Sequence, residues 1–254
     1  MRVFALSDVH IDYEPNAQWI SDISRYDYRS DVLLLAGDVS GRIDRLEWCV
    51  ATLAARFRRV MFVPGNHDLW TCQEKTGRSS MEKLNDIMKL VAGHGGLTGH
   101  YRAAGLLIIP IFSWYDYSFG EPSDELKTIW MDYYACRWPA GYEARDIAER
   151  MFAINEAPIS AGPHEKVITF SHFLPRKDLL SGTHWQHRLL YPVLGSHAIE
   201  QRLRRLRADI HVYGHSHVNR DVCLDRVQYV NSAIGYPREA QFTSRRLLCI
   251  HDET

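Results

Sequence analysis

Seven side chains with metal-binding donor atoms directly follow short apolar stretches of the sequence. They are Asp8, His10, Asp38, Asn66, His172, His215 and His217. Because the carboxyl ends of strands in an open α/β sheet meet at one crevice, these separate loops are expected to bring their donors together. A buried cluster of carboxylates and imidazoles is costly unless cations neutralise it. The pattern therefore predicts a metal site.

The donor types narrow the choice of metal. Imidazole, carboxylate and one amide oxygen, without thiolate, suit manganese, iron or zinc. Seven donors are more than one transition metal ion needs. If one carboxylate bridges, two ions can lie about 3.5 to 4 Å apart and hold the attacking and departing oxygens of an in-line displacement. Such a centre is typical of phosphoryl transfer.

Five short motifs carry these donors in a fixed order, namely Asp8-x-His10, Gly37-Asp38, Gly65-Asn66-His67-Asp68, the isolated His172 and Gly214-His215-x-His217. One such motif alone is weak evidence, but all five in order at strand ends are specific. The set resembles the calcineurin-like metallophosphoesterase family. The resemblance implies a four-layer αββα sandwich and a dinuclear metal-dependent phosphoesterase. Such an enzyme hydrolyses a small phosphomonoester or phosphodiester by attack of a metal-bound hydroxide.

The resemblance also implies a role for each donor. The first metal ion would be held by Asp8, His10 and His217, the second by Asn66, His172 and His215, and Asp38 would bridge them. His67 would stay unligated and act as the catalytic residue, donating to the leaving oxygen or to charge developing on the phosphoryl group.

One position departs from the family pattern. Many members carry Asp or Asn three residues after the bridging aspartate to orient the catalytic histidine, and this chain has Gly41. Another group must then orient His67. Asp68 is the nearest candidate in the sequence, and a backbone carbonyl is the alternative.

Two residues beside the motifs are candidates for substrate binding. Arg176 follows His172 closely and could bind a phosphate with two hydrogen bonds, and Asn219 lies just past His217. For each, a solvated surface position is an equal alternative. The aromatic stretches 112–117 and 184–187 could stack on a substrate, but packing is the more common use of such residues.

Alternating strands and helices must position these motifs. Apolar stretches at 3–6, 32–35, 60–63, 106–109, 167–170 and 210–213 predict buried strands, and helical spacing recurs at 46–57, 81–91 and 199–206. This order is typical of a layered α/β domain spanning 1–254. The aromatic, acidic segment 116–162 predicts an inserted helical lobe with helices near 126–135 and 145–154. Strands at 227–230 and 247–250 are expected to share a more antiparallel sheet.

The composition limits the possible partners. A net charge of -1 gives no overall field for nucleic acid, so a nuclease-like phosphodiesterase is a weaker alternative. A non-catalytic metal-binding scaffold is a second alternative, although no donor is missing. Five cysteines without a C-x-x-C pair indicate reduced thiols. No signal peptide fits before Asp8 and no apolar run reaches about 20 residues, so we expect a cytoplasmic protein that does not enter membranes. The oligomeric state is left open.

Overall fold

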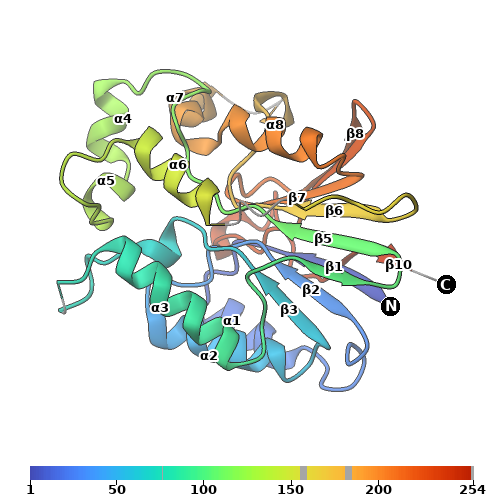
Figure 1. The fold of residues 1–254 in the computed structure, drawn as a ribbon. Coiled ribbons are helices and arrows are strands. Elements are labelled where there is room, and N and C mark those ends of the chain that lie inside the picture. The colour runs from blue at the N-terminus through green and yellow to red at the C-terminus, as the bar shows by residue number, and fades with distance from the viewer. Residues whose placement is uncertain (76, 155–158, 181–184, 253–254) are drawn as a thin grey trace.

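The computed structural model describes residues 1–75, 77–154, 159–180 and 185–252, and it describes residues 185–187 by their backbone alone. Two sheets pack face to face, and helices cover their outer sides (Figure 1). The predicted four-layer αββα sandwich is thus confirmed. The predicted strands all form, with bounds that shift by no more than one residue, except that the last strand ends two residues later than expected.

The first sheet has the strand order β10-β1-β2-β3. Strands β1 (Arg2–Leu6), β2 (Val32–Leu35) and β3 (Arg59–Phe62) are parallel, and β10 (Leu248–Asp252) lies antiparallel to β1. Helices α1 (Glu14–Asp22), α2 (Ile43–Ala54) and α3 (Ser80–Gly93) lie on its outer side (Figure 1). Apolar residues three and four apart on α2 are buried, which is why this helix packs against the sheet.

The second sheet has the order β4-β5-β6-β7-β9-β8. Strands β5 (Leu106–Pro110), β6 (Lys166–Phe170), β7 (Ile210–Tyr213) and β9 (Val227–Asn231) are parallel, with β4 (Tyr101–Ala103) and β8 (Arg220–Leu224) antiparallel at the edges. Helices α7 (Trp185–Leu194) and α8 (His197–Arg205) cover its outer side. The central strands read as continuous apolar runs because both of their faces are buried.

The segment between β5 and β6 contains three helices, α4 (Asp124–Ile129), α5 (Asp132–Ala135) and α6 (Ala144–Ala153). The helix expected near 126–135 is therefore two short helices separated at Trp130 and Met131. Ser123 accepts a hydrogen bond from the backbone N–H of Leu126 and begins α4, which is the usual role of an N-cap serine. In the described part of the chain, no helix is both long and apolar enough to cross a membrane.

The prediction for the last two strands is wrong. β9 and β10 lie in different sheets, because β9 fills the place between β7 and β8 while β10 crosses to the open edge of β1. An edge strand with free backbone groups gains hydrogen bonds from such a partner. The two sheets meet near the end of β1, where Ser7 forms a bridge with Ala233. The loop after β9 is thereby brought beside the loop after β1.

Two glycines allow the loops after β2 and β3 to approach closely. A Cβ atom on Gly65 would overlap the carboxylate and the backbone nitrogen of Asp38, and one on Gly37 would overlap the backbone of Gly65. Gly37 also has a φ of 80°, a conformation that side chains disfavour. The Gly-Asp and Gly-Asn-His-Asp motifs therefore need their glycines for contact between backbones.

We expect Gly65→Ala to lower the free energy of unfolding by about 1 to 3 kcal/mol, the usual cost of forcing extra volume into a packed site. Gly99→Ala is the matched control, since a Cβ atom there would meet nothing within 4 Å. Urea unfolding of both variants measures the difference. Equal stability of the two variants would contradict the close approach of these loops.

Candidate metal centre

The structure brings the seven predicted donors together at the carboxyl ends of β1, β2, β3, β6 and β7. Donor atoms within 4.8 Å of one another form two groups, one of Asp8, His10, Asp38 and His217, and one of Asp38, His172 and His215. Asn66 joins the second group, with its Oδ1 atom 3.2 Å from Nε2 of His172. Six of the seven side chains are buried.

The second group has a hydrogen-bonding pattern that fits a bound cation. His172 donates from Nδ1 to the carbonyl of Ala36 at 2.9 Å, and His215 donates from Nε2 to the carbonyl of Val193 at 3.1 Å. Their other nitrogens lie 3.1 Å apart. Each of these nitrogens then carries a lone pair in the neutral ring, so neither can donate to the other. A metal ion between them would resolve this contact, and the donor set fits one.

The first group shows the same fit through a carboxylate outside the predicted set. His217 donates from Nδ1 to Glu239 at 2.6 Å, which leaves Nε2 facing Asp8 at 3.3 Å and His10 at 3.1 Å. Burial lowers the pKa of His217, but Asp8 and Glu239 outweigh it and raise the pKa to about 10. A negative field of this kind is what a metal cation would neutralise. A histidine held by a carboxylate in this way is a common arrangement beside metal ions.

Asp38 lies between the two groups. Its Oδ2 atom is 3.5 Å from Nε2 of His172 and 3.9 Å from Nε2 of His10. Burial raises the pKa of Asp38, and the charges of Asp68 and Asp8 raise it further. Neighbouring cations would reverse this effect. The position suits a carboxylate that is shared by two ions.

The backbone of the centre is strained. Asp8, His10, Asp38, His215 and His217 all have φ values between 42° and 66°. Residues with side chains rarely adopt this left-handed conformation, and it persists where the surrounding structure enforces it. Five of the seven donors have this strained backbone, which indicates that the surrounding structure holds the donors in place against their local backbone preference.

Asp68 does not orient His67 as the sequence suggested. Both of its carboxylate oxygens accept backbone N–H groups, from Asp38 and Gly65 at Oδ2 and from Val39 and Ser40 at Oδ1, at 2.8 to 3.1 Å. Burial raises the pKa of Asp68 to about 6 against the effect of these four bonds. Asp68 therefore joins the loops after β2 and β3.

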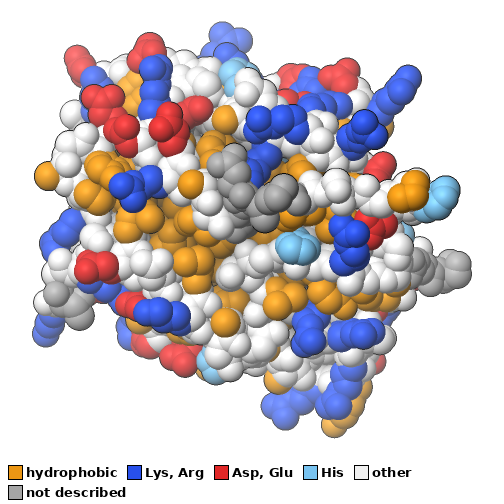
Figure 2. Space-filling view, in the orientation of Figure 1, with side chains coloured by type: hydrophobic (Ala, Val, Ile, Leu, Met, Phe, Trp, Pro, Cys, Tyr) orange, Lys and Arg blue, Asp and Glu red, His pale blue; other side chains and the backbone are white. Residues whose placement is uncertain are grey.

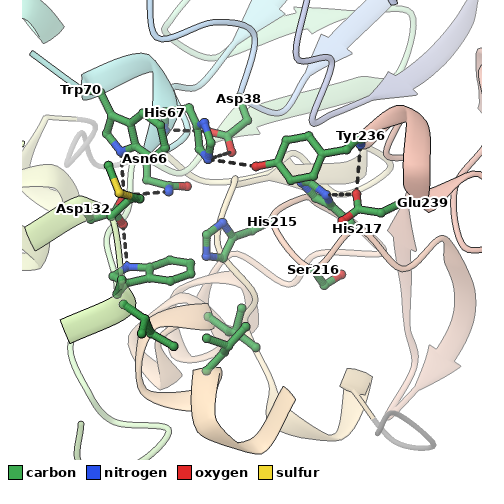
Figure 3. A pocket seen from close by; sticks show the side chains of 15 residues that line it. Asp38, Asn66, His67, Trp70, Asp132, His215, Ser216, His217, Tyr236 and Glu239 are labelled. Atoms are coloured by element: carbon green, nitrogen blue, oxygen red, sulfur yellow. Dashed lines mark hydrogen bonds and ion pairs between the residues drawn. The ribbon is translucent and has the colours of Figure 1, made fainter. Parts of the chain in front are cut away.

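His67 is instead held between two aromatic side chains (Figure 3). Its ring stacks on Trp70 with centroids 3.7 Å apart, and its Nε2 atom lies 3.4 Å from the hydroxyl of Tyr236. A Cβ atom on Gly41 would lie 3.8 Å from the Trp70 ring, so Trp70 borders the place of the missing family side chain. Burial lowers the pKa of His67 to about 3, with a further contribution from His217.

A buried carboxylate of the inserted segment completes the centre. Asp132 accepts a hydrogen bond from the amide of Asn66 at 2.9 Å and from the indole N–H of Trp70 at 2.7 Å, both at Oδ1. Its Oδ2 atom accepts from the indole N–H of Trp130 at 2.9 Å. Burial raises the pKa of Asp132 to about 6, opposed by these bonds.

A pocket of about 290 Å³ opens above the donors. Its polar side consists of donors and their partners, labelled in Figure 3, and its apolar side is lined by Trp70, Ile129, Trp130, Met131, Leu190 and Leu194. Ile129 and Met131 are each about half exposed. Figure 2 shows hydrophobic side chains gathered on this face between the regions of α5 and α3.

The two residues predicted to bind substrate lie elsewhere in the fold. Arg176 bonds the carboxylates of Asp178, Asp225 and Glu200, and Asn219 bonds the backbone of Ala233, which follows β9. Neither residue lines the pocket. Trp114 and Tyr115 of the stretch 112–117 are buried against other aromatic rings. The stretch 184–187 lies outside the residues whose side chains are described.

Trp70, Asp132, Tyr236 and Glu239 were missed by the sequence analysis. Each lies in a loop or short helix, outside the five motifs. Metal-ligating histidines usually donate to a carboxylate or carbonyl, so an acidic partner was to be expected, but the chain has 31 acidic residues among which to choose.

A two-sheet sandwich that gathers carboxylates, imidazoles and an amide at its strand ends defines a metallophosphoesterase. The sequence model of the calcineurin-like phosphoesterase family matches residues 1–219, and the chain belongs to this family. It is accordingly a hydrolase of phosphoric esters, and the resemblance inferred from its motifs is confirmed. The nuclease-like and scaffold alternatives are not favoured.

The chain is also similar to a protein of Mycobacterium tuberculosis named acyl-carrier-protein phosphodiesterase PptH. The two are 28% identical over 269 residues, which cover 93% of this chain and 78% of that protein. A crystal structure of phosphopantetheinyl hydrolase PptH from the same organism gives a TM-score of 0.79 at 26% identity, covering 94% of this chain and 91% of that one. A further solved structure, 11% identical with a TM-score of 0.55, covers 91% of this chain and 90% of its own, and shares the fold alone.

We expect Glu239→Gln to weaken metal binding by about 10-fold to 100-fold, because His217 loses the charge of its carboxylate partner. Calorimetric titration of the metal-free protein with Mn²⁺ measures the affinity. Glu149→Gln, a change on the exposed side of α6, is the control. Unchanged affinity in Glu239→Gln would show that this carboxylate does not support a metal ligand.

Proposed function

We propose that the chain hydrolyses a phosphodiester with the help of two divalent or trivalent metal ions. Asp8, His10 and His217 would hold one ion, Asn66, His172 and His215 the other, and Asp38 both. Manganese, iron and zinc suit these donors. Ions bound there would polarise the phosphoryl oxygens and activate water for in-line attack. The facing lone pairs of His172 and His215, 3.1 Å apart, support this proposal most directly.

The charge of the pocket favours a diester over a monoester. None of the lining residues that the structure describes is Lys or Arg, whereas Asp38, Asp132 and Glu239 are acidic. A phosphomonoester carries close to two negative charges at neutral pH, and proteins usually match them with arginine or lysine. A phosphodiester carries one. Two metal ions are then sufficient to balance the negative charge of the substrate.

The apolar side of the pocket suits an uncharged arm on the phosphate. Ile129, Trp130 and Met131 of the inserted segment, together with Leu190 and Leu194 of α7, offer burial and no charge. The pantetheine arm, built from amides and short aliphatic groups, has this character. The names of the similar proteins point to the same group, since they refer to acyl carrier protein and to phosphopantetheinyl hydrolysis.

The proposed substrate is therefore phosphopantetheine joined to the serine of an acyl carrier protein. The bond between phosphorus and the serine oxygen breaks, water supplies the new oxygen on phosphorus, and a proton goes to the serine oxygen. His67 would act at this step. A neutral imidazole with its proton at Nε2 donates a hydrogen bond without being a cation, which fits its low pKa. The hydroxyl of Tyr236 lies 3.4 Å from that nitrogen and Tyr236 also lines the pocket.

Mass spectrometry of a carrier protein tests the substrate. We expect the manganese-loaded enzyme to convert the phosphopantetheinylated protein to its unmodified form and to release 4′-phosphopantetheine. A parallel pair of substrates tests the charge argument, because bis(4-nitrophenyl) phosphate should be hydrolysed faster than 4-nitrophenyl phosphate. An enzyme that leaves the carrier protein intact and prefers the monoester would refute the proposal.

We expect His67→Ala to lower kcat by about 100-fold to 10,000-fold while two metal ions still bind, since the side chain acts on the substrate and not on the metal. His100→Ala, at an exposed position, is the matched histidine control. Metal content by elemental analysis accompanies the rate measurement. Full activity, or loss of a metal ion together with activity, would contradict this role of His67.

A further inference from the structure

We propose that Asp132 is a positioning residue through which the inserted segment sets three parts of the active site. These are the side-chain orientation of Asn66, the place of Trp70 against His67, and the place of Trp130 in the pocket wall. The proposal builds on the metal-binding role of Asn66 given above. It also makes the segment 116–162 part of the same domain as the two sheets.

The contact with Asn66 selects which end of the amide faces the metal donors. An asparagine side chain has one oxygen, which can bind a metal ion, and one NH₂ group, which cannot. The carboxylate of Asp132 accepts this NH₂ group at 2.9 Å, so Oδ1 of Asn66 turns toward His172 at 3.2 Å. Rotation of the amide would lose the bond to Asp132 and set Oδ1 against the Asp132 carboxylate, and the group facing the metal donors would then be NH₂, which cannot bind a metal ion.

The contact with Trp70 fixes the surface on which His67 rests. The indole N–H is held at 2.7 Å by the same oxygen that accepts from Asn66, and the ring lies 3.7 Å from the imidazole centroid at an angle of 27°. The backbone carbonyl of Trp70 accepts a second bond, from the buried ammonium of Lys83. Stacking on a fixed ring therefore takes over the orienting task for which Gly41 offers no side chain.

The other oxygen of Asp132 holds the substrate side of the pocket. Trp130 donates to Oδ2 at 2.9 Å, and its ring meets that of His215 edge to face, with centroids 5.8 Å apart. One carboxylate thus connects a proposed metal ligand, the support of the proposed catalytic histidine and the apolar wall. These three partners all donate to Asp132, the hydroxyl of Tyr115 is a fourth hydrogen-bond partner, and Asp132 itself is only 2% exposed. A buried carboxylate with these partners has the geometry of a fixed junction.

Titration of the metal-free protein with Mn²⁺, with free Mn²⁺ followed by electron paramagnetic resonance, tests the proposal without any substrate. We expect the unchanged protein to bind two ions. In Asp132→Leu, which offers no acceptor, the second ion should bind about 10-fold to 100-fold more weakly. Asp132→Asn retains one oxygen acceptor and should recover part of this loss. Asp124→Asn, at a fully exposed position on α4, should bind as the unchanged protein does.

Kinetics separate the two oxygens of Asp132. Trp130→Phe removes only the donor to Oδ2, so it should raise KM for the diester and leave kcat and Mn²⁺ binding unchanged. Asp132→Leu should lower kcat as well, because Trp70 and His67 lose their support. A purely structural role would instead lower the stability of both variants without this division between KM and kcat.

Two results would overturn the positioning role. One is a second Mn²⁺ bound as tightly by Asp132→Leu as by the unchanged protein, and the other is equal weakening in Asp132→Leu and Asp132→Asn. If Asp132→Leu does not fold, Asp132→Ala takes its place, and unweakened Mn²⁺ binding in Asp132→Ala overturns the role equally. Fewer than two ions bound by the unchanged protein would refute the proposed metal centre itself, and these outcomes are therefore distinct.

Discussion

Burial of many electron-pair donors at one place is the constraint on which this structure depends. His172 and His215 face each other with lone pairs 3.1 Å apart, and the carboxylates of Asp8 and Asp38 lie in the same water-poor region. Without cations such an arrangement is repulsive, and the stability of the rest of the fold must offset its free-energy cost. The left-handed backbone at five donors and the close approach of Gly37 and Gly65 are understandable as consequences, because no relaxed loop would bring these atoms so near.

The partners of the donors fall into two types with different physical effects. His172 and His215 bond to backbone carbonyls, which are fixed by the sheets and by α7, whereas His217 bonds to the carboxylate of Glu239. A carboxylate raises the basicity of the imidazole more than a carbonyl does, so the two proposed metal positions have unequal electrostatic surroundings. The loops that supply donors also hold one another. Asp68, for example, connects the loops after β2 and β3 through hydrogen bonds to their backbones.

The residues of the site that could be predicted from the sequence are those that lie at the ends of strands. Apolar runs followed closely by Asp8, Asp38, Asn66, His172 and His215 sufficed to predict both the buried strands and the meeting of these side chains, because strand direction decides where loops converge. Contacts between loops could not be predicted from the sequence. Asn66 and Asp132 are 66 residues apart and Tyr236 is 169 residues from His67, and no period or motif connects them. The error about β9 and β10 has the same origin, since neighbours in sequence were assigned to one sheet although an open strand edge lay in the other.

In the proposed enzyme, the inserted segment would adapt the metal centre to a particular ester. The sheets supply the donors, and these alone favour no organic group over another. Trp130, Met131 and Asp132 are consecutive residues at the junction of α4 and α5. Two of them form pocket wall and the third reaches past the wall to Asn66 and Trp70. In the proposed enzyme, a change at Asp132 would therefore act on substrate fit and on metal binding together. The proposal thus links substrate selectivity and metal binding through the hydrogen bonds of a single buried carboxylate.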